Sequence, residues 1–278
     1  MQPNSLQQGP DTLRSATRTV GRQASTFTTH FLPPALLIIG VLLLTEICAR
    51  AGLTGRSLPP PSEVAISTWH DGSALFNETL STLFVAIYGF IAATLISLTL
   101  AFIVYTVRRT ETTIMTAAAV LSSVPIMAIM PMLLIWMGPF VSTRIVLTCL
   151  ICVFPIIVSA IQGVQAAGSR LDDLFTVMAA RPWQRFRRLA LPVAVPYLFV
   201  GLRIAAPLSI LGALVAEWSG ASSGLGVLML NAMFSLQIDR LWSTVLIACC
   251  ISLAAYGYIC LIERLALPAE RVIEGASV

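Results

Sequence analysis

Few residues of this 278-residue sequence are arranged in a way that would support chemistry on their own. Cys149 and Cys152 have CxxC spacing, which occurs in zinc and redox sites, but they lie within the apolar stretch VLTCLICVFPIIV. No histidine or acidic residue lies beside them to complete a metal site, so we interpret both as small apolar residues in helix contacts. The strings GxxxxGKS/T and HExxH are absent, which argues against a phosphate-binding loop or a zinc-hydrolase site of that type in this chain.

Ionisable residues in apolar segments form a second group of candidates, because a charge in a membrane is costly and is therefore a functional candidate by default. Glu46 precedes Arg50 by four residues, a spacing that favours an ion pair on one helix face. Arg203 lies within an apolar segment, and we interpret it as a structural anchor. Glu217 and Trp218 follow the same segment and are candidates for a pathway or gate, although tryptophan there is also typical of a membrane interface.

The segments that must position these residues are long and apolar. Hydrophobic residues make up 57% of the sequence and charged residues 11%, against about 25% charged residues in a soluble domain. The apolar residues form blocks of roughly 20, enough for a helix to cross a hydrocarbon layer about 30 Å thick. We therefore predict an all-α, polytopic membrane protein with about six transmembrane helices and a cytoplasmic coupling helix. The predicted spans are about 32–50, 83–107, 112–137, 142–164, 193–216 and 241–263.

The connections between these spans differ in character. Tight hairpins are predicted at Arg108 to Glu111 and around Gly138 and Pro139. The segment 217–240 contains the apolar string VLMLNAMF, which is too short to span and predicts a re-entrant or interfacial helix. Three prolines within spans are expected to kink their helices: Pro125, Pro131 and Pro155.

The arginines predict the orientation, since cytoplasmic segments of membrane proteins carry an excess of positive charge. With a cytoplasmic N-terminus, the inside segments hold Arg14, Arg18, Arg22, Arg108, Arg109, Arg170, Arg181, Arg185, Arg187, Arg188, Arg264 and Arg271. The outside segments hold only Arg50, Arg56, Arg144 and Arg240. This distribution predicts that both termini are cytoplasmic.

The inside segment 165–192, QAAGSRLDDLFTVMAARPWQRFRRLALP, mixes charged residues with apolar residues at helical spacing. One face of a short amphipathic helix would carry Leu171, Leu174, Phe175 and Met178. An exposed apolar face needs a covering surface: the bilayer, the protein's own helix ends or a groove on a soluble partner. A basic interfacial loop without a partner is the alternative interpretation.

This segment resembles the EAA loop of ABC importer permeases. Asp173-Leu174-Phe175 stands at the EAA position, Ala179 at the glycine position, and Trp183-Gln184 and Leu191-Pro192 match the downstream half. The bulkier residues and the lost glycine predict a partner groove with matching changes. Four further strings resemble the nitrate, sulfonate, taurine and thiamine-precursor group of the binding-protein-dependent transport family: LPPPSEV at 58–64, PIMAIMPMLLIWMG at 125–138, GLRIA at 201–205 and VAEWSGASSGLGVLML at 215–230.

The resemblance implies the permease subunit of an ATP-driven importer in a bacterial inner membrane, with domain 32–264 between cytoplasmic tails 1–31 and 265–278. It implies no catalytic residue, no metal and no directly bound cofactor. ATP would be hydrolysed on a separate ABC ATPase subunit, and an extracytoplasmic solute-binding protein would deliver cargo to a pore formed by two copies among membrane lipid. No nucleic-acid partner is expected. The ATPase contact would involve Asp173, Leu174, Phe175, Met178, Ala179, Arg181, Trp183, Gln184, Leu191 and Pro192.

An ion-coupled secondary transporter is the main alternative. It predicts internal repeats and acidic residues deep within several spans, and the sequence shows neither. The sequence does not identify the transported solute. The string EWSGASSGLG at 217–226 resembles permeases for thiamine-precursor pyrimidines or related heterocycles, and sulfonates, taurine and nitrate are alternatives.

Overall fold

The computed structural model describes residues 36–37, 39–53, 55, 57–166, 187–188 and 191–267. Contacts divide the chain into two units, Met1–Ala65 and Ile66–Val278. Helices and short turns make up the described residues, which contain no strand. The predicted all-α class is therefore confirmed.

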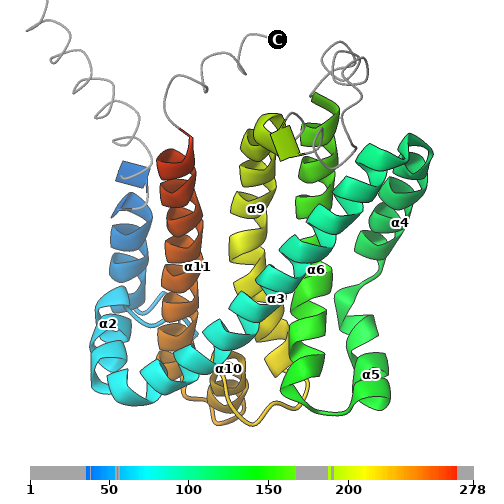
Figure 1. The fold of residues 1–278 in the computed structure, drawn as a ribbon. Coiled ribbons are helices and arrows are strands. Elements are labelled where there is room, and N and C mark those ends of the chain that lie inside the picture. Colours follow the sequence, from blue (N-terminus) through cyan, green and yellow to red (C-terminus); the bar gives the residue numbers. More distant parts are fainter. Residues whose placement is uncertain are drawn as a thin grey trace, which may run out of the picture. The chain divides into compact units, whose positions relative to one another are not determined.

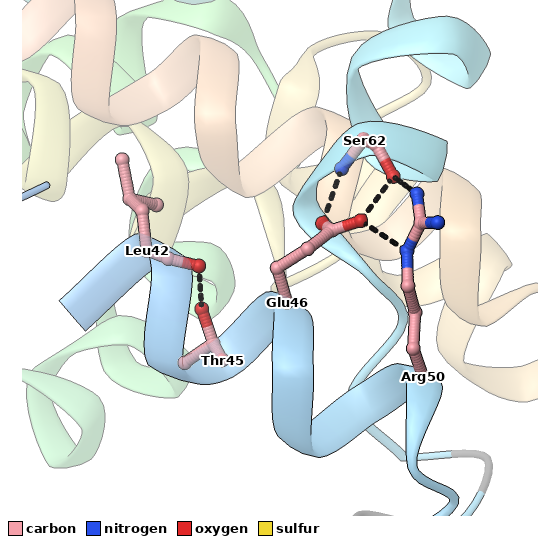
Figure 2. Close-up of polar contacts among 5 residues, drawn as sticks. All are labelled: Leu42, Thr45, Glu46, Arg50 and Ser62. Carbon is pink, nitrogen blue, oxygen red and sulfur yellow. Dashed lines mark hydrogen bonds and ion pairs between the residues drawn. The ribbon is translucent and has the colours of Figure 1, made fainter. Parts of the chain in front are cut away.

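In the first unit, residues 36–37 and 39–50 are helical, and they are the described part of the predicted first span. Glu46 forms the expected ion pair with Arg50, whose Nε lies 2.7 Å from the carboxylate. The same carboxylate accepts hydrogen bonds from the backbone N–H (3.1 Å) and the hydroxyl (2.8 Å) of Ser62 (Figure 2). Ser62 lies in the first turn of α2 (Pro61–His70), where a negative charge is favourable. Glu46 therefore has a structural role, because it holds the start of α2.

Four described helices of the second unit are long and apolar enough to cross a membrane. They are α3 (Gly72–Thr106), α6 (Val141–Ala166), α9 (Leu191–Glu217) and α11 (Ile238–Ala266). α6 packs against both α3 and α9, and small residues allow the close approach. A Cβ atom on Gly89 of α3 would lie 2.6 Å from Thr148 of α6, and one on Gly201 of α9 would lie 2.8 Å from the carbonyl oxygen of Pro155.

The predicted third span is broken rather than kinked. α4 (Glu111–Ser123) and α5 (Ile126–Met137) meet at an angle of 95° across Val124 and Pro125. Val124 is extended (φ −75°, ψ 127°), because a proline disfavours the helical conformation of the residue before it. If α4 and α5 are counted as one span, the described residues contain five spans, against the approximate prediction of six. Pro131 and Pro155, by contrast, lie inside continuous helices.

The connections follow the predicted hairpins. A 3₁₀ turn at Arg108–Thr110 joins α3 to α4, and Gly138, with φ at 77°, ends α5. The predicted short helix in segment 217–240 is α10 (Leu225–Phe234), which packs on α3, α9 and α11. Figure 1 shows α10 at the lower end of the bundle, beside the start of α11 and the end of α9. That end contains the candidate gate residue Glu217.

Candidate functional site

Most of the predicted ATPase contact lies outside the described residues. This is true of Asp173, Leu174, Phe175, Met178, Ala179, Arg181, Trp183 and Gln184. Leu191 and Pro192 are the first two residues of α9. Proline is well tolerated in a first helical turn, because the backbone N–H that it lacks would have no partner within the helix there. The coupling helix therefore stays a prediction, and the described site lies at the other end of α9 from Leu191 and Pro192.

Glu217, the last residue of α9, is only 1% exposed. Its Oε2 atom accepts a hydrogen bond from the backbone N–H of Gly226 (2.8 Å) and another from the hydroxyl of Thr82 (3.1 Å). Its Oε1 atom is also buried and has no hydrogen-bond partner among the described residues. A buried carboxylate is costly unless donors surround it. The donors on Oε2 therefore fix the position of the Glu217 side chain.

The start of α10 is held by side chains from α3 and α9. The backbone N–H of Gly224 donates to the Glu78 carboxylate, and that of Leu225 donates to the Thr82 hydroxyl (2.9 Å). The first N–H groups of a helix lack partners within the helix, and negative charge is favourable there. Because Glu78, Thr82 and Glu217 supply the acceptors, they dock the first turn of α10 onto α3 and α9.

Arg144 of α6 adds a positive charge to this region, and it is only 8% exposed. Its Nη1 donates to the backbone carbonyl of Ser223 (3.3 Å), and the Ser223 hydroxyl lies 2.9 Å from that of Ser81 in α3. Arg144 lies in the first turn of α6, and its assignment to the outside stays a prediction; it was not identified from the sequence as a buried charge. Its place inside the predicted span 142–164 was the signal that could have identified it as a buried charge.

We call Glu78, Ser81, Thr82, Arg144, Glu217, Ser223 and the N–H groups of residues 224–226 the Glu217 cluster. Two glycines make it sterically feasible. A Cβ atom on Gly224 would lie 2.1 Å from the Glu217 carboxyl carbon, and φ there is +127°. A Cβ atom on Gly226 would lie 2.6 Å from the carbonyl oxygen of Leu214. The glycines of the string SGLG at 223–226 thus let a backbone turn close over a buried carboxylate.

Trp218, the second candidate gate residue, behaves differently from Glu217. Its backbone N–H continues the helical pattern by donating to Leu214 (3.2 Å), but the residue is 42% exposed. The adjacent crevice, lined by Arg144, Ala216 and Ser219, has a volume of about 10 Å³, close to that of a single water position. This crevice, which contacts the cluster at Arg144, is therefore too small for cargo.

These observations define a polytopic helical membrane protein with a broken span and a polar cluster at one end. Residues 93–266, which include α6, α9, α10 and α11, match the family described as binding-protein-dependent transport system inner membrane component. The chain belongs to that family, and it is an ABC transporter permease. The resemblance predicted from the sequence strings is confirmed.

Individual relatives extend the match over most of the chain. A formylaminopyrimidine transport permease of Halalkalibacterium halodurans is 27% identical over 238 residues, which is 85% of this chain and 95% of that protein. A probable ABC transporter permease of Haemophilus influenzae is 30% identical over 223 residues, 80% and 91% of the two chains. A putative aliphatic sulfonates transport permease of Bacillus subtilis is 23% identical over 258 residues, 92% of each.

Proposed function

We propose that this chain is the membrane-spanning subunit of an ATP-driven importer, and that it moves a small solute delivered by an extracytoplasmic binding protein. The observation that carries the proposal is the family match over residues 93–266, which includes the segment between α6 and α9 with the predicted coupling helix. ATP hydrolysis is assigned to a separate ATPase subunit, because the sequence has no phosphate-binding string. The relatives named for formylaminopyrimidine and for aliphatic sulfonates support a small solute.

The proposal includes an orientation in a bacterial inner membrane with both termini cytoplasmic. Arg108, Arg109 and Arg264 lie at the end of the bundle where α3 meets α4 and where α11 ends. The opposite end carries the Glu217 cluster and the ion pair between Asp71 and Arg240, whose Nε lies 3.4 Å from the carboxylate. The positive-inside rule favours the first end as cytoplasmic. The Glu217 cluster would then face the binding protein.

The proposal also includes a second copy of the chain. Large apolar side chains are exposed along α5, among them Ile135 (83%) and Trp136 (71%). In a membrane such a face is covered either by lipid or by another helix bundle. Two copies related by a two-fold axis would give each ATPase subunit of a dimer one coupling helix.

Co-purification tests the assignment directly. The chain is co-expressed with the ATPase subunits encoded beside it, as wild type and as Asp173→Arg with Trp183→Ala. The matched control is Asp239→Arg with Trp69→Ala, which makes the same changes at exposed residues outside the predicted coupling segment. We expect wild type and control to retain an ATPase and the first double variant to lose it.

The contrary outcome is equally clear. If folded wild-type protein retained no ATPase from any neighbouring gene, the importer assignment would be wrong. An ion-coupled secondary transporter would then take its place, and the segment 165–192 would be a basic interfacial loop.

A further inference from the structure

A cavity of about 420 Å³ lies between the helices of the second unit, away from the Glu217 cluster. It is bounded by the end of α4, the start of α5, and residues near the middle of α6 and α9. Of the twelve described residues that line it, ten have hydrocarbon side chains, two are serines and none is charged. Its volume is within the range of about 300–1,000 Å³ that is common for small-molecule sites.

The break between α4 and α5 forms one wall of this cavity. Helix ends leave carbonyl and N–H groups without helical partners, and here they lie within a predicted membrane span. The hydroxyls of Ser122 and Ser123 both donate to the carbonyl of Ala119 (2.8 Å each), so part of the helix end is satisfied locally. Irregular backbone at membrane depth is tolerated only where protein buries it or where it lines a watery cavity. The described residues leave Leu121 (38%) and Ser122 exposed at the break. The break is therefore compatible with a watery cavity or with cover by a second copy of the chain, and it disfavours a lipid chain at this position.

The wall chemistry restricts which ligand fits. An anion among hydrocarbon side chains would lose its hydration without gaining a cation, and that loss is costly. An uncharged ring compound would instead bury its faces against Phe154 and the aliphatic side chains. Its heteroatoms could exchange hydrogen bonds with Ser122, Ser159 and the backbone at the break.

We infer that this cavity is a binding site for cargo in transit, and that it accepts an uncharged planar heterocycle rather than a sulfonate or nitrate anion. The inference rests on the proposed importer function, and it narrows the substrate class. The cavity would discriminate between neutral and anionic solutes after the binding protein has delivered them. The discrimination would come from the free energy needed to place a charge among the hydrocarbon side chains of α4, α6 and α9.

The first test asks whether cargo uses the cavity. The permease, its ATPase and its binding protein are reconstituted in proteoliposomes, and uptake of labelled formylaminopyrimidine, riboflavin, taurine and nitrate is measured. Ile204→Trp places an indole in the cavity, whereas Leu211→Trp changes a residue of the same helix outside the lining. The two positions are matched in exposure, at 51% and 52%. We expect Ile204→Trp to lower uptake of the transported compound about tenfold and Leu211→Trp to leave it near the wild-type rate.

The second test determines whether the cargo is neutral or anionic, and it does not require the cargo to be identified. Ser122 is exposed, so Ser122→Asp, Ser122→Arg and the neutral control Ser122→Asn do not disturb the packing between helices, and retention of the ATPase by each variant checks that it is folded. A neutral cargo predicts that the Asp and Arg variants slow uptake alike, within about threefold of each other. An anionic cargo predicts that Arg preserves uptake while Asp abolishes it, and that asymmetry would overturn the inference.

Retention of the ATPase separates this inference from the proposed function. If the wild-type complex retains its ATPase but both tryptophan variants transport at the wild-type rate, the cavity is not a cargo site, although the importer assignment stands. If Ile204→Trp fails to fold, the comparison of Ser122→Asp with Ser122→Arg still decides the charge. If only taurine or nitrate is taken up, the inferred substrate class is wrong.

Discussion

The Glu217 cluster and the mid-bundle cavity share helices α6 and α9, and they differ in packing, charge and volume. The cluster brings Glu217, Glu78 and Arg144 together with backbone N–H groups, and the crevice beside it has about 10 Å³. The cavity has a volume of about 420 Å³ and a wall where a helix is interrupted, and no charged residue is among the described residues that line it. Polar groups are concentrated where packing is tight, and they are sparse where space is left.

This difference follows from how each region is stabilised. At the end of the bundle, hydrogen bonds between elements distant in sequence dock α10 onto α3 and α9. At the cavity, a proline interrupts a helix without an equivalent polar network, and free volume results. Substitutions in the cluster should therefore reduce stability, whereas substitutions at the cavity should reduce transport and leave stability nearly unchanged.

The largest stability effect is expected for Gly224→Ala. The added Cβ would lie 2.1 Å from the Glu217 carboxyl carbon, at a backbone φ of +127°. Overpacking costs about 1–3 kcal/mol and the strained backbone about 1–3 kcal/mol more. Thermal unfolding of the purified protein in detergent, followed by tryptophan fluorescence, should show a large loss of stability together with a loss of uptake.

Gly220→Ala separates the two causes. Gly220 also has a positive φ (+105°), but nothing lies within 4 Å of an added Cβ. This variant should lose only the strain contribution of about 1–3 kcal/mol. Equal destabilisation by both variants would mean that the carboxylate does not pack tightly against residue 224.

A smaller loss of stability is expected for Glu217→Ala. The change leaves the Gly226 N–H without its acceptor, whereas the Thr82 hydroxyl can still donate to the Glu78 carbonyl (3.2 Å). A buried unsatisfied donor costs about 1–3 kcal/mol. Glu217→Gln retains one oxygen acceptor and should unfold at a temperature between those of wild type and the alanine variant. If Glu217→Ala were instead more stable than wild type while transport was lost, the carboxylate would serve the transport cycle at the expense of stability.

The sequence predicted the uninterrupted spans best. Spans 142–164, 193–216 and 241–263 agree with α6, α9 and α11 to within three residues at each end. A continuous apolar block of this length spans a membrane as a single helix, because a helix satisfies its backbone hydrogen bonds internally. By contrast, α3 begins at Gly72 rather than near residue 83, because the polar residues of its first turns resembled a loop.

The cluster and the helix break could not be predicted in the same way. Thr82 and Glu217 are separated by 135 positions, and spacing in one sequence does not pair such distant residues. Pro125, Pro131 and Pro155 are equally visible in the sequence, yet only Pro125 separates two helices. Just before Pro125, the hydroxyls of Ser122 and Ser123 donate to the Ala119 carbonyl, and these bonds accompany the end of α4. No helix ends beside Pro131 or Pro155 in the described structure.

The smallest stability effect is expected for Pro125→Ala. Alanine restores a backbone N–H and removes the clash that keeps Val124 extended, so α4 and α5 can approach a continuous helix and the cavity loses a wall. Stability should change by no more than about 1 kcal/mol, while uptake in proteoliposomes should fall several-fold. Pro131→Ala is the control, since Pro131 lies inside α5 and does not line the cavity. If Pro125→Ala destabilised the protein as much as Glu217→Ala, the break would be a structural element like the cluster, and the contrast between the two regions would fail.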